Sequence, residues 1–69
     1  MSGFGQWLAA FEGEGSAIGD LARDAAADPL WPDGPDEIDV FREHLEELGV
    51  MEAALETLGR AWEQYEVWS

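Results

Sequence analysis

The sequence predicts an all-α fold, a compact bundle of four to five helices in a single domain that spans the whole chain. Large apolar side chains recur at helical spacing in four segments, and the longest is residues 50–68. Its apolar face carries Leu55, Leu58, Trp62 and Tyr65. Glycine or proline separates the segments, and none shows the alternation of a β-strand. Because a chain of 69 residues without cysteine cannot form disulfides, its stability has to rest on packing.

The first helix is expected over residues 4–12. Phe4, Trp7 and Phe11 recur there at spacings that place them on one face. The glycine-containing stretch that follows ends the helix. Residues 1–3 are expected to be disordered, as chain ends commonly are.

The second helix is expected over residues 17–27, with Ser16 as its N-cap. Gly19 has no side chain, so a neighbouring helix or aromatic ring can approach it closely. The expected buried face consists of Ile18, Leu21, Ala22 and Ala25.

Residues 28–35 contain three prolines and one glycine, which excludes a continuing helix and predicts a loop. Leu30 and Trp31 are too apolar for a free loop. We expect both to fold back over the core as a plug.

The third helix is expected to begin with Asp33 or Asp36 as its N-cap and Pro35 in its first turn. Gly49 should end it in the left-handed conformation. The expected buried stripe consists of Ile38, Phe41, Leu45 and Leu48.

The last helix follows over residues 50–68. Gly59 in its interior costs about 1 kcal/mol relative to alanine, so we expect it to serve close packing and Gly59→Leu to be destabilising. Val67 and Trp68 lie at the chain end, where burial is difficult. They are expected to form a small exposed apolar patch of the kind that marks an interface.

Four motifs occur in the same order as in a known family. They are Phe4-x-x-Trp7-Leu8, Ile18-Gly19-Asp20-Leu21-Ala22-x-Asp24, Asp28-Pro29-x-Trp31-Pro32 and Ala61-Trp62-x-x-Tyr65. Together they resemble the YozE family of small bacterial proteins, which have a sterile alpha motif (SAM)-like helical fold. The resemblance covers nearly the whole chain and implies a compact four- to five-helix domain. It implies no particular activity, because SAM-like folds serve in protein interaction and in nucleic-acid binding. The chain departs from the family in being more acidic and in lacking lysine.

The charge of the chain is strongly negative. Sixteen acids against three arginines give a net charge of −13, spread as −5 over residues 1–34 and −8 over residues 35–69. Such a charge repels nucleic-acid phosphates and anionic membranes and attracts basic proteins. No signal peptide or membrane-spanning run is found, which favours a soluble cytoplasmic protein.

The sequence offers little for catalysis or for cofactors. His44 is the one histidine, and no nucleophile is expected within its reach, so we interpret it as a residue at the edge of the core. Acidic clusters could attract a divalent cation, but their spacing fits no calcium loop and favours loose ion association. The clusters are Asp20, Asp24 and Asp28, and Asp33, Asp36, Glu37 and Asp39. We therefore expect no metal, no cofactor and no enzyme activity.

The sequence favours a protein-interaction module that binds a partner with a basic surface. Polymers of SAM domains typically join an acidic surface of one copy to a basic surface of the next, and Arg60 is the sole basic residue of the last helix. The chain itself is therefore expected to be a monomer or weak oligomer. The alternative is an inhibitor that mimics nucleic acid with carboxylates and occupies a DNA-binding protein. The candidate contact residues are Glu43, Glu46, Glu47, Glu52, Glu56, Glu63, Glu66 and Trp68.

Overall fold

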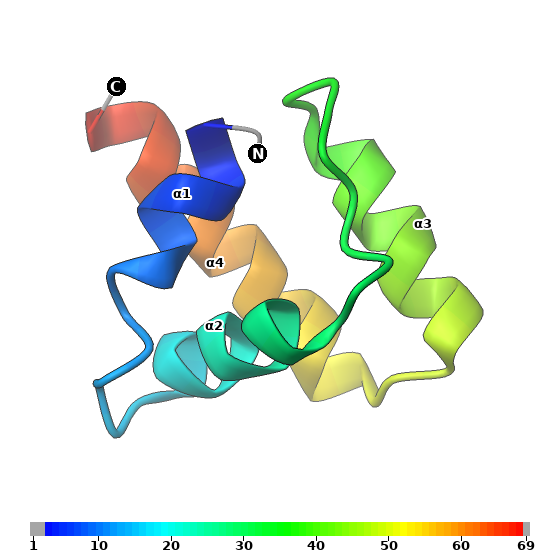
Figure 1. Ribbon diagram of the computed structural model, residues 1–69, viewed down its shortest axis with the longest axis horizontal. Helices are drawn as coiled ribbons and strands as arrows, with labels where there is room; N and C mark the ends of the chain where they lie inside the picture. The colour runs from blue at the N-terminus through cyan, green and yellow to red at the C-terminus, as the bar shows by residue number, and fades with distance from the viewer. Residues whose placement is uncertain (1–2, 69) are drawn as a thin grey trace.

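The protein folds into four helices over the residues that the computed structural model describes, 3–68 (Figure 1). They are α1 (Gly3–Ala9), α2 (Ala17–Ala27), α3 (Ile38–Leu48) and α4 (Glu52–Trp68). This part of the chain contains no strand, and the all-α prediction is confirmed.

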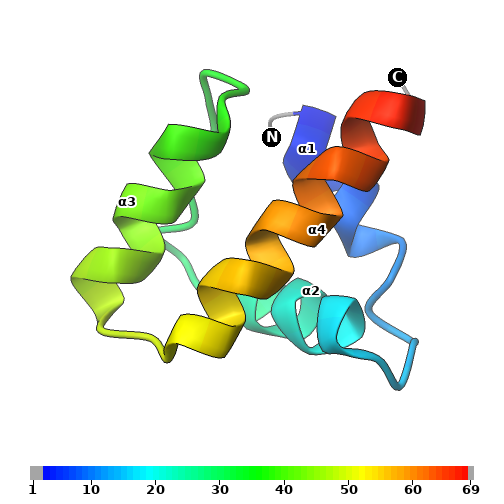
Figure 2. The ribbon, with the colours of Figure 1, turned by 180° about the vertical axis from the view of Figure 1, so that it is seen from behind.

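Helix α4 is the element on which the other three are packed. It contacts α1, α2 and α3, and α1 also contacts α2. In the view from behind, α4 lies nearest the viewer, with α3 on one side of it and α1 and α2 on the other (Figure 2). The prediction that the last helix is the longest is correct, although it begins at Glu52 and not at Val50.

The centre of the core is aromatic. Phe4 of α1 and Phe41 of α3 are both fully buried, with ring centroids 4.9 Å apart. Trp62 of α4 lies 5.0 Å from Phe4, so three helices meet at these rings. Leu8 and Leu58 extend the core toward α2. Aromatic side chains bury a large area per residue, which suits a domain of this size.

Helix α1 differs from its prediction at both ends. It begins at Gly3, which was expected to be disordered, whereas residues 1–2 lie outside the described part of the chain. It ends at Ala9 and not at residue 12. Beyond it, the backbone forms 3₁₀-type turns, in which each N–H donates to the carbonyl three residues earlier. For example, the N–H of Phe11 donates to the carbonyl of Leu8 at 2.9 Å.

Helix α2 has the predicted bounds and the predicted cap. The hydroxyl of Ser16 accepts from the backbone N–H of Gly19 at 3.2 Å. Gly19 does allow a close approach, but the neighbour is the backbone of the chain's own preceding turn and not the expected helix or aromatic ring. A Cβ at this position would lie 2.1 Å from the carbonyl oxygen of Glu14.

The plug predicted in the loop is half correct. Trp31 is half-buried and stacks on Phe41, with ring centroids 5.5 Å apart. Leu30, by contrast, is 74% exposed. Leu30 lies in a turn, closed by the hydrogen bond from the N–H of Trp31 to the carbonyl of Asp28 at 3.2 Å, and its side chain is left in solvent.

The predicted start of the third helix is wrong. The N-cap of α3 is Glu37, with no side-chain cap, and Pro35 precedes the helix. Asp36 points instead to another helix and accepts from the backbone N–H of Phe4 at 3.0 Å. An anion at the N-terminus of α1 satisfies a donor that α1 cannot satisfy itself.

The end of α3 follows the prediction in its backbone but not in its burial. Gly49 has φ +73°, and the N–H of Val50 donates to the carbonyl of Leu45 at 3.3 Å. Leu48, expected in the core, is 55% exposed. The last turn of α3 lies at the outer edge of the molecule, where no other helix covers it (Figure 1).

Gly59 does not serve close packing. Apart from its chain neighbours and the nearby backbone of α4, a Cβ at this position would find no atom within 4 Å. The expectation that Gly59 is there for close packing is therefore wrong, whereas the destabilising effect of Gly59→Leu stays a prediction.

Candidate functional site

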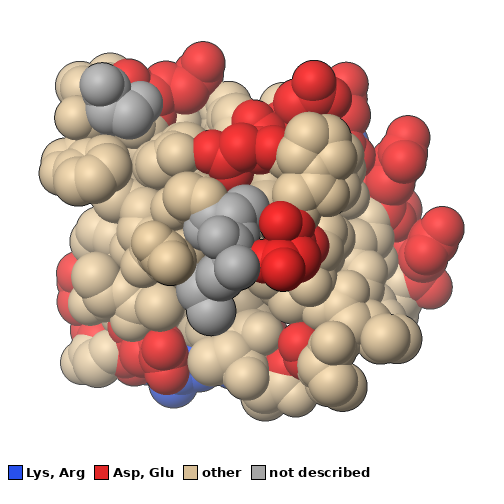
Figure 3. Space-filling view, turned by 45° about the horizontal axis from the view of Figure 1, so that its top comes forward, with Lys and Arg blue, Asp and Glu red and all other residues tan. Residues whose placement is uncertain are grey.

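The predicted contact glutamates are all exposed. They lie on two helices, with Glu43, Glu46 and Glu47 on α3 and Glu52, Glu56, Glu63 and Glu66 on α4. In the space-filling view, acidic side chains gather along the α3 edge and around the rim of the face shown, while very little basic surface is visible (Figure 3). This arrangement creates a negative field that attracts cationic groups.

The end of α4 exposes the predicted apolar patch. Val67 is 89% exposed and Trp68 is 71% exposed. A shallow hollow brings both together with Glu63 and Gln64. Of the predicted contact residues, the structure thus places Glu63 and Trp68 at one surface, whereas Glu43, Glu46 and Glu47 lie on a different helix.

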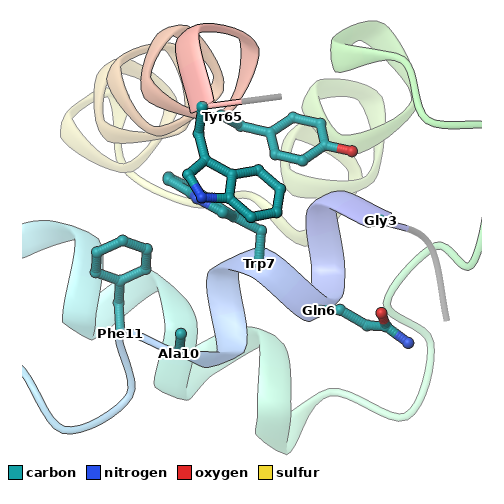
Figure 4. Close-up of a pocket in the computed structure, with 7 residues that line it drawn as sticks. Gly3, Gln6, Trp7, Ala10, Phe11 and Tyr65 are labelled. Carbon is teal, nitrogen blue, oxygen red and sulfur yellow. The ribbon is translucent and has the colours of Figure 1, made fainter.

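Trp68 also borders a groove of about 550 Å³ between α1 and the last turns of α4 (Figure 4). Trp7 and Phe11 point toward α4 from the α1 side, and Tyr65 comes from α4. The rings are close: Trp7 lies 4.7 Å from Phe11 and 5.7 Å from Tyr65, and Trp68 stacks on Tyr65 at 6.3 Å. The groove is mainly apolar and offers the faces and edges of four aromatic rings.

Asp36 holds the side chain of Tyr65 at one end of this groove. The hydroxyl of Tyr65 donates to Oδ2 of Asp36 at 2.5 Å. This hydrogen bond raises the pKa of Tyr65 above its ordinary value, and burial and the charge of Asp36 act in the same direction. Gly3 lies against this pair, since a Cβ there would be 2.6 Å from the Tyr65 hydroxyl.

His44 lies where the sequence predicted, at the edge of the core. Its Nε2 is 2.5 Å from Oδ2 of Asp28, and Trp31 packs edge-on against its ring. The contact with His44 lowers the pKa of Asp28, and the hydrogen bond from the Leu30 backbone N–H adds to this effect. The pair therefore ties the start of the loop to α3. Its contribution to stability is present above the ordinary pKa of Asp28 and is lost as pH falls through the lowered one.

Several members of the predicted acidic clusters form separate ion pairs with nearby basic side chains. Asp20 pairs with Arg23, Asp39 pairs with Arg42, and Asp28 pairs with His44. Within residues 3–68, no group of three or more histidine or acidic side chains is placed to hold a metal ion. In the same range, no helix is long and apolar enough to cross a membrane.

Sequence reasoning missed the groove and the role of Asp36. It assigned Trp7, Phe11 and Tyr65 to the core because their spacing fits one helix face, yet each is only half-buried. No signal in the sequence links Asp36 to a residue 29 positions away.

Comparison with known proteins places the chain in a family. No curated protein and no solved structure gives a significant match. The family model described as YozE SAM-like fold matches residues 3–67, which is nearly the whole chain and includes all four helices except the last residue of α4. The chain therefore belongs to the YozE SAM-like fold family.

Proposed function

We propose that this protein is a non-enzymatic, cytoplasmic interaction module that binds another protein through the end of α4. The supporting observation is Trp68, which is 71% exposed beside the exposed carboxylate of Glu63. Exposure of the large apolar ring of tryptophan to water is unfavourable, and tryptophan is enriched among the interface residues that contribute most of the binding free energy. The proposal treats the chain as a single domain that acts as a monomer or weak oligomer.

The partner is expected to present a basic surface. The exposed carboxylate of Glu63 borders the apolar patch, and the net charge of −13 steers cationic surfaces toward the protein. The same charge disfavours direct binding to nucleic acids and to anionic membranes. Absence of cysteine suits the reducing cytoplasm.

Within residues 3–68, the hydroxyl groups and the one histidine that catalysis would need are engaged in structural contacts. The hydroxyls of Ser16 and Thr57 bond to their own helices, and that of Tyr65 donates to Asp36. His44 is held by Asp28 under the Trp31 ring. These contacts support a non-enzymatic role, because a general base needs a nucleophile or substrate within hydrogen-bonding reach.

The exposed glutamates on α3 and α4 favour a second candidate function. Carboxylates along two adjacent helices can imitate phosphates and occupy the basic cleft of a DNA-binding protein. In that case charge supplies nearly all of the binding energy, and the apolar end of α4 contributes little.

Affinity capture from lysate, with washes at low and high salt, tests both functions. The baits are the wild type, Trp68→Ala, and a variant with glutamine at the positions of Glu46, Glu47, Glu56 and Glu63. An interaction through the α4 end predicts a defined protein that withstands the high-salt wash and is lost with Trp68→Ala. The mimic predicts basic nucleic-acid enzymes that leave at high salt and are lost with the glutamine variant. If no bait captures anything, both functions are wrong.

A further inference from the structure

The groove between α1 and α4 combines an apolar aromatic lining with a negative potential. Trp7, Phe11, Tyr65 and Trp68 line it, and no charged side chain is among the lining residues. A carboxylate, Asp36, is bound to the hydroxyl of Tyr65 at its Gly3 end. A plain apolar ligand would use the rings alone, whereas a cation would use both the rings and the field.

The hydrogen bond to Asp36 makes the Tyr65 ring a better acceptor of a cation. A phenol that donates its proton to a carboxylate becomes richer in electrons, and the negative face of the ring becomes more negative. The same hydrogen bond raises the pKa of Tyr65 because it stabilises the neutral phenol, and burial and the negative charge of Asp36 add to this effect. A field that opposes a phenolate favours a cation at the same place.

We propose that this groove binds an arginine side chain presented by the partner protein, a statement that rests on the interaction function proposed above. A guanidinium is planar and weakly hydrated, so it can stack on the aromatic rings that line the groove, while the charge of Asp36, bound to the Tyr65 hydroxyl, attracts it. Among the described residues, Phe4 donates to one oxygen of Asp36 and Tyr65 to the other, and a carboxylate oxygen has a second lone pair for a further donor. Lysine has the charge but not the planar shape that the rings accommodate.

A second copy of this chain is a poorer occupant. Two of its three arginines, Arg23 and Arg42, are paired with aspartates of their own chain. Two molecules that each carry a net charge of −13 also repel one another. The charge balance therefore favours a basic partner.

The test titrates the whole protein with three five-residue peptides, acetyl-Ala-X-Ala-X-Ala-amide, in which X is arginine, lysine or citrulline. Citrulline has nearly the shape of arginine without its charge. NMR spectra report the four indole N–H groups separately, and Trp31 and Trp62, which do not line the groove, serve as internal controls. The expected result is that the arginine peptide shifts the Trp7 and Trp68 signals and binds more tightly than the lysine peptide, while citrulline gives the weakest binding. Equal binding of the arginine and lysine peptides would overturn the proposal, as would shifts confined to other parts of the molecule.

Two matched pairs of variants connect the binding to the groove. Trp68→Leu keeps an apolar side chain but removes the ring, and we expect it to weaken the arginine peptide about 3- to 5-fold. Val67→Ala, a change at the more exposed neighbour outside the groove, should leave binding unchanged. Asp36→Asn should weaken binding more than Glu46→Gln on α3, although each removes one negative charge. Equal losses within either pair would contradict the proposal.

The outcome is separable from that of the proposed function. If the capture experiment yields a partner that depends on Trp68 while the arginine peptide fails to bind, the groove proposal alone is wrong. If the peptide binds in the groove but no partner is captured, the interaction function is wrong and the groove remains a cation-binding site.

Discussion

At the scale of single residues, Asp36 does more than its place in the sequence suggests. It lies just before α3, but one oxygen accepts from the N-terminus of α1 and the other from Tyr65 of α4. A short side chain at the start of α3 thus contacts both α1, which is distant in the chain, and the far end of α4. Local patterns predict caps within a few residues, so a cap supplied from 32 positions away could not be predicted.

The Asp36–Tyr65 contact has a measurable pH dependence. Because the pKa of Tyr65 is raised, the stability from this contact is fully present below pH 10.0, its ordinary pKa, and is lost as pH rises through the raised value. Tyr65 is the one tyrosine, so a phenolate absorbance titration reports it alone. We expect a midpoint above 10.0 in the wild type and a lower one in Asp36→Asn. A wild-type midpoint at or below 10.0 would show that the contact does not form.

Substitution by alanine is expected to change the free energy of unfolding in opposite directions at Gly19 and Gly59. Gly19→Ala places a Cβ against the Glu14 carbonyl and should lower the free energy of unfolding by about 1–3 kcal/mol. Gly59→Ala meets no neighbour and should raise it by about 0.5–1 kcal/mol, because alanine is the better helix former. Urea unfolding measures both. If Gly59→Ala proved the more destabilising of the two, the packing described for α2 and α4 would be wrong.

At the scale of elements, helical periodicity and capping patterns predicted the features that depend on residues close together in the sequence. The bounds of α2, the Ser16 cap and the left-handed Gly49 were all predicted correctly, since each depends on neighbouring residues. Burial at the ends of elements depends on which helix lies opposite. For that reason Leu48 and Leu30 were placed in the core although both are exposed.

The loop between α2 and α3 should be anchored by Trp31 and not by Leu30. Trp31→Ala removes contacts with Phe41 and His44 and should lower the free energy of unfolding by roughly 2 kcal/mol, less than for a fully buried tryptophan. Leu30→Ala, at a side chain 74% exposed, should change it by less than about 0.5 kcal/mol. Chemical unfolding of the two variants makes the comparison. Similar losses would mean that both residues form the plug.

At the scale of the whole molecule, the net charge acts on the fold itself. The structure extends 28 × 27 × 21 Å, and at an ionic strength of about 0.01 M the Debye length is roughly 30 Å, so the excess carboxylates repel one another across the whole molecule. At about 0.15 M that length is roughly 8 Å, and the repulsion is limited to neighbours.

We therefore expect the urea midpoint to rise with sodium chloride between these two concentrations, because screening relieves the repulsion in the folded state. Potassium chloride, measured as a control, should act equally, since the effect depends on ionic strength and not on a bound ion. A midpoint that falls with salt would mean that attractive pairs such as Arg23–Asp20 outweigh the repulsion.

The central claim is that Trp68 serves binding and not folding. The most direct measurement is the affinity of a captured partner for Trp68→Ala, by calorimetry, on protein whose urea unfolding has been recorded. We expect the free energy of unfolding to stay within about 0.5 kcal/mol of the wild type and the affinity to fall by a factor of roughly 30 or more, as for an interface hot spot. An unchanged affinity would contradict the claim, and so would a loss of affinity that is accompanied by loss of the fold.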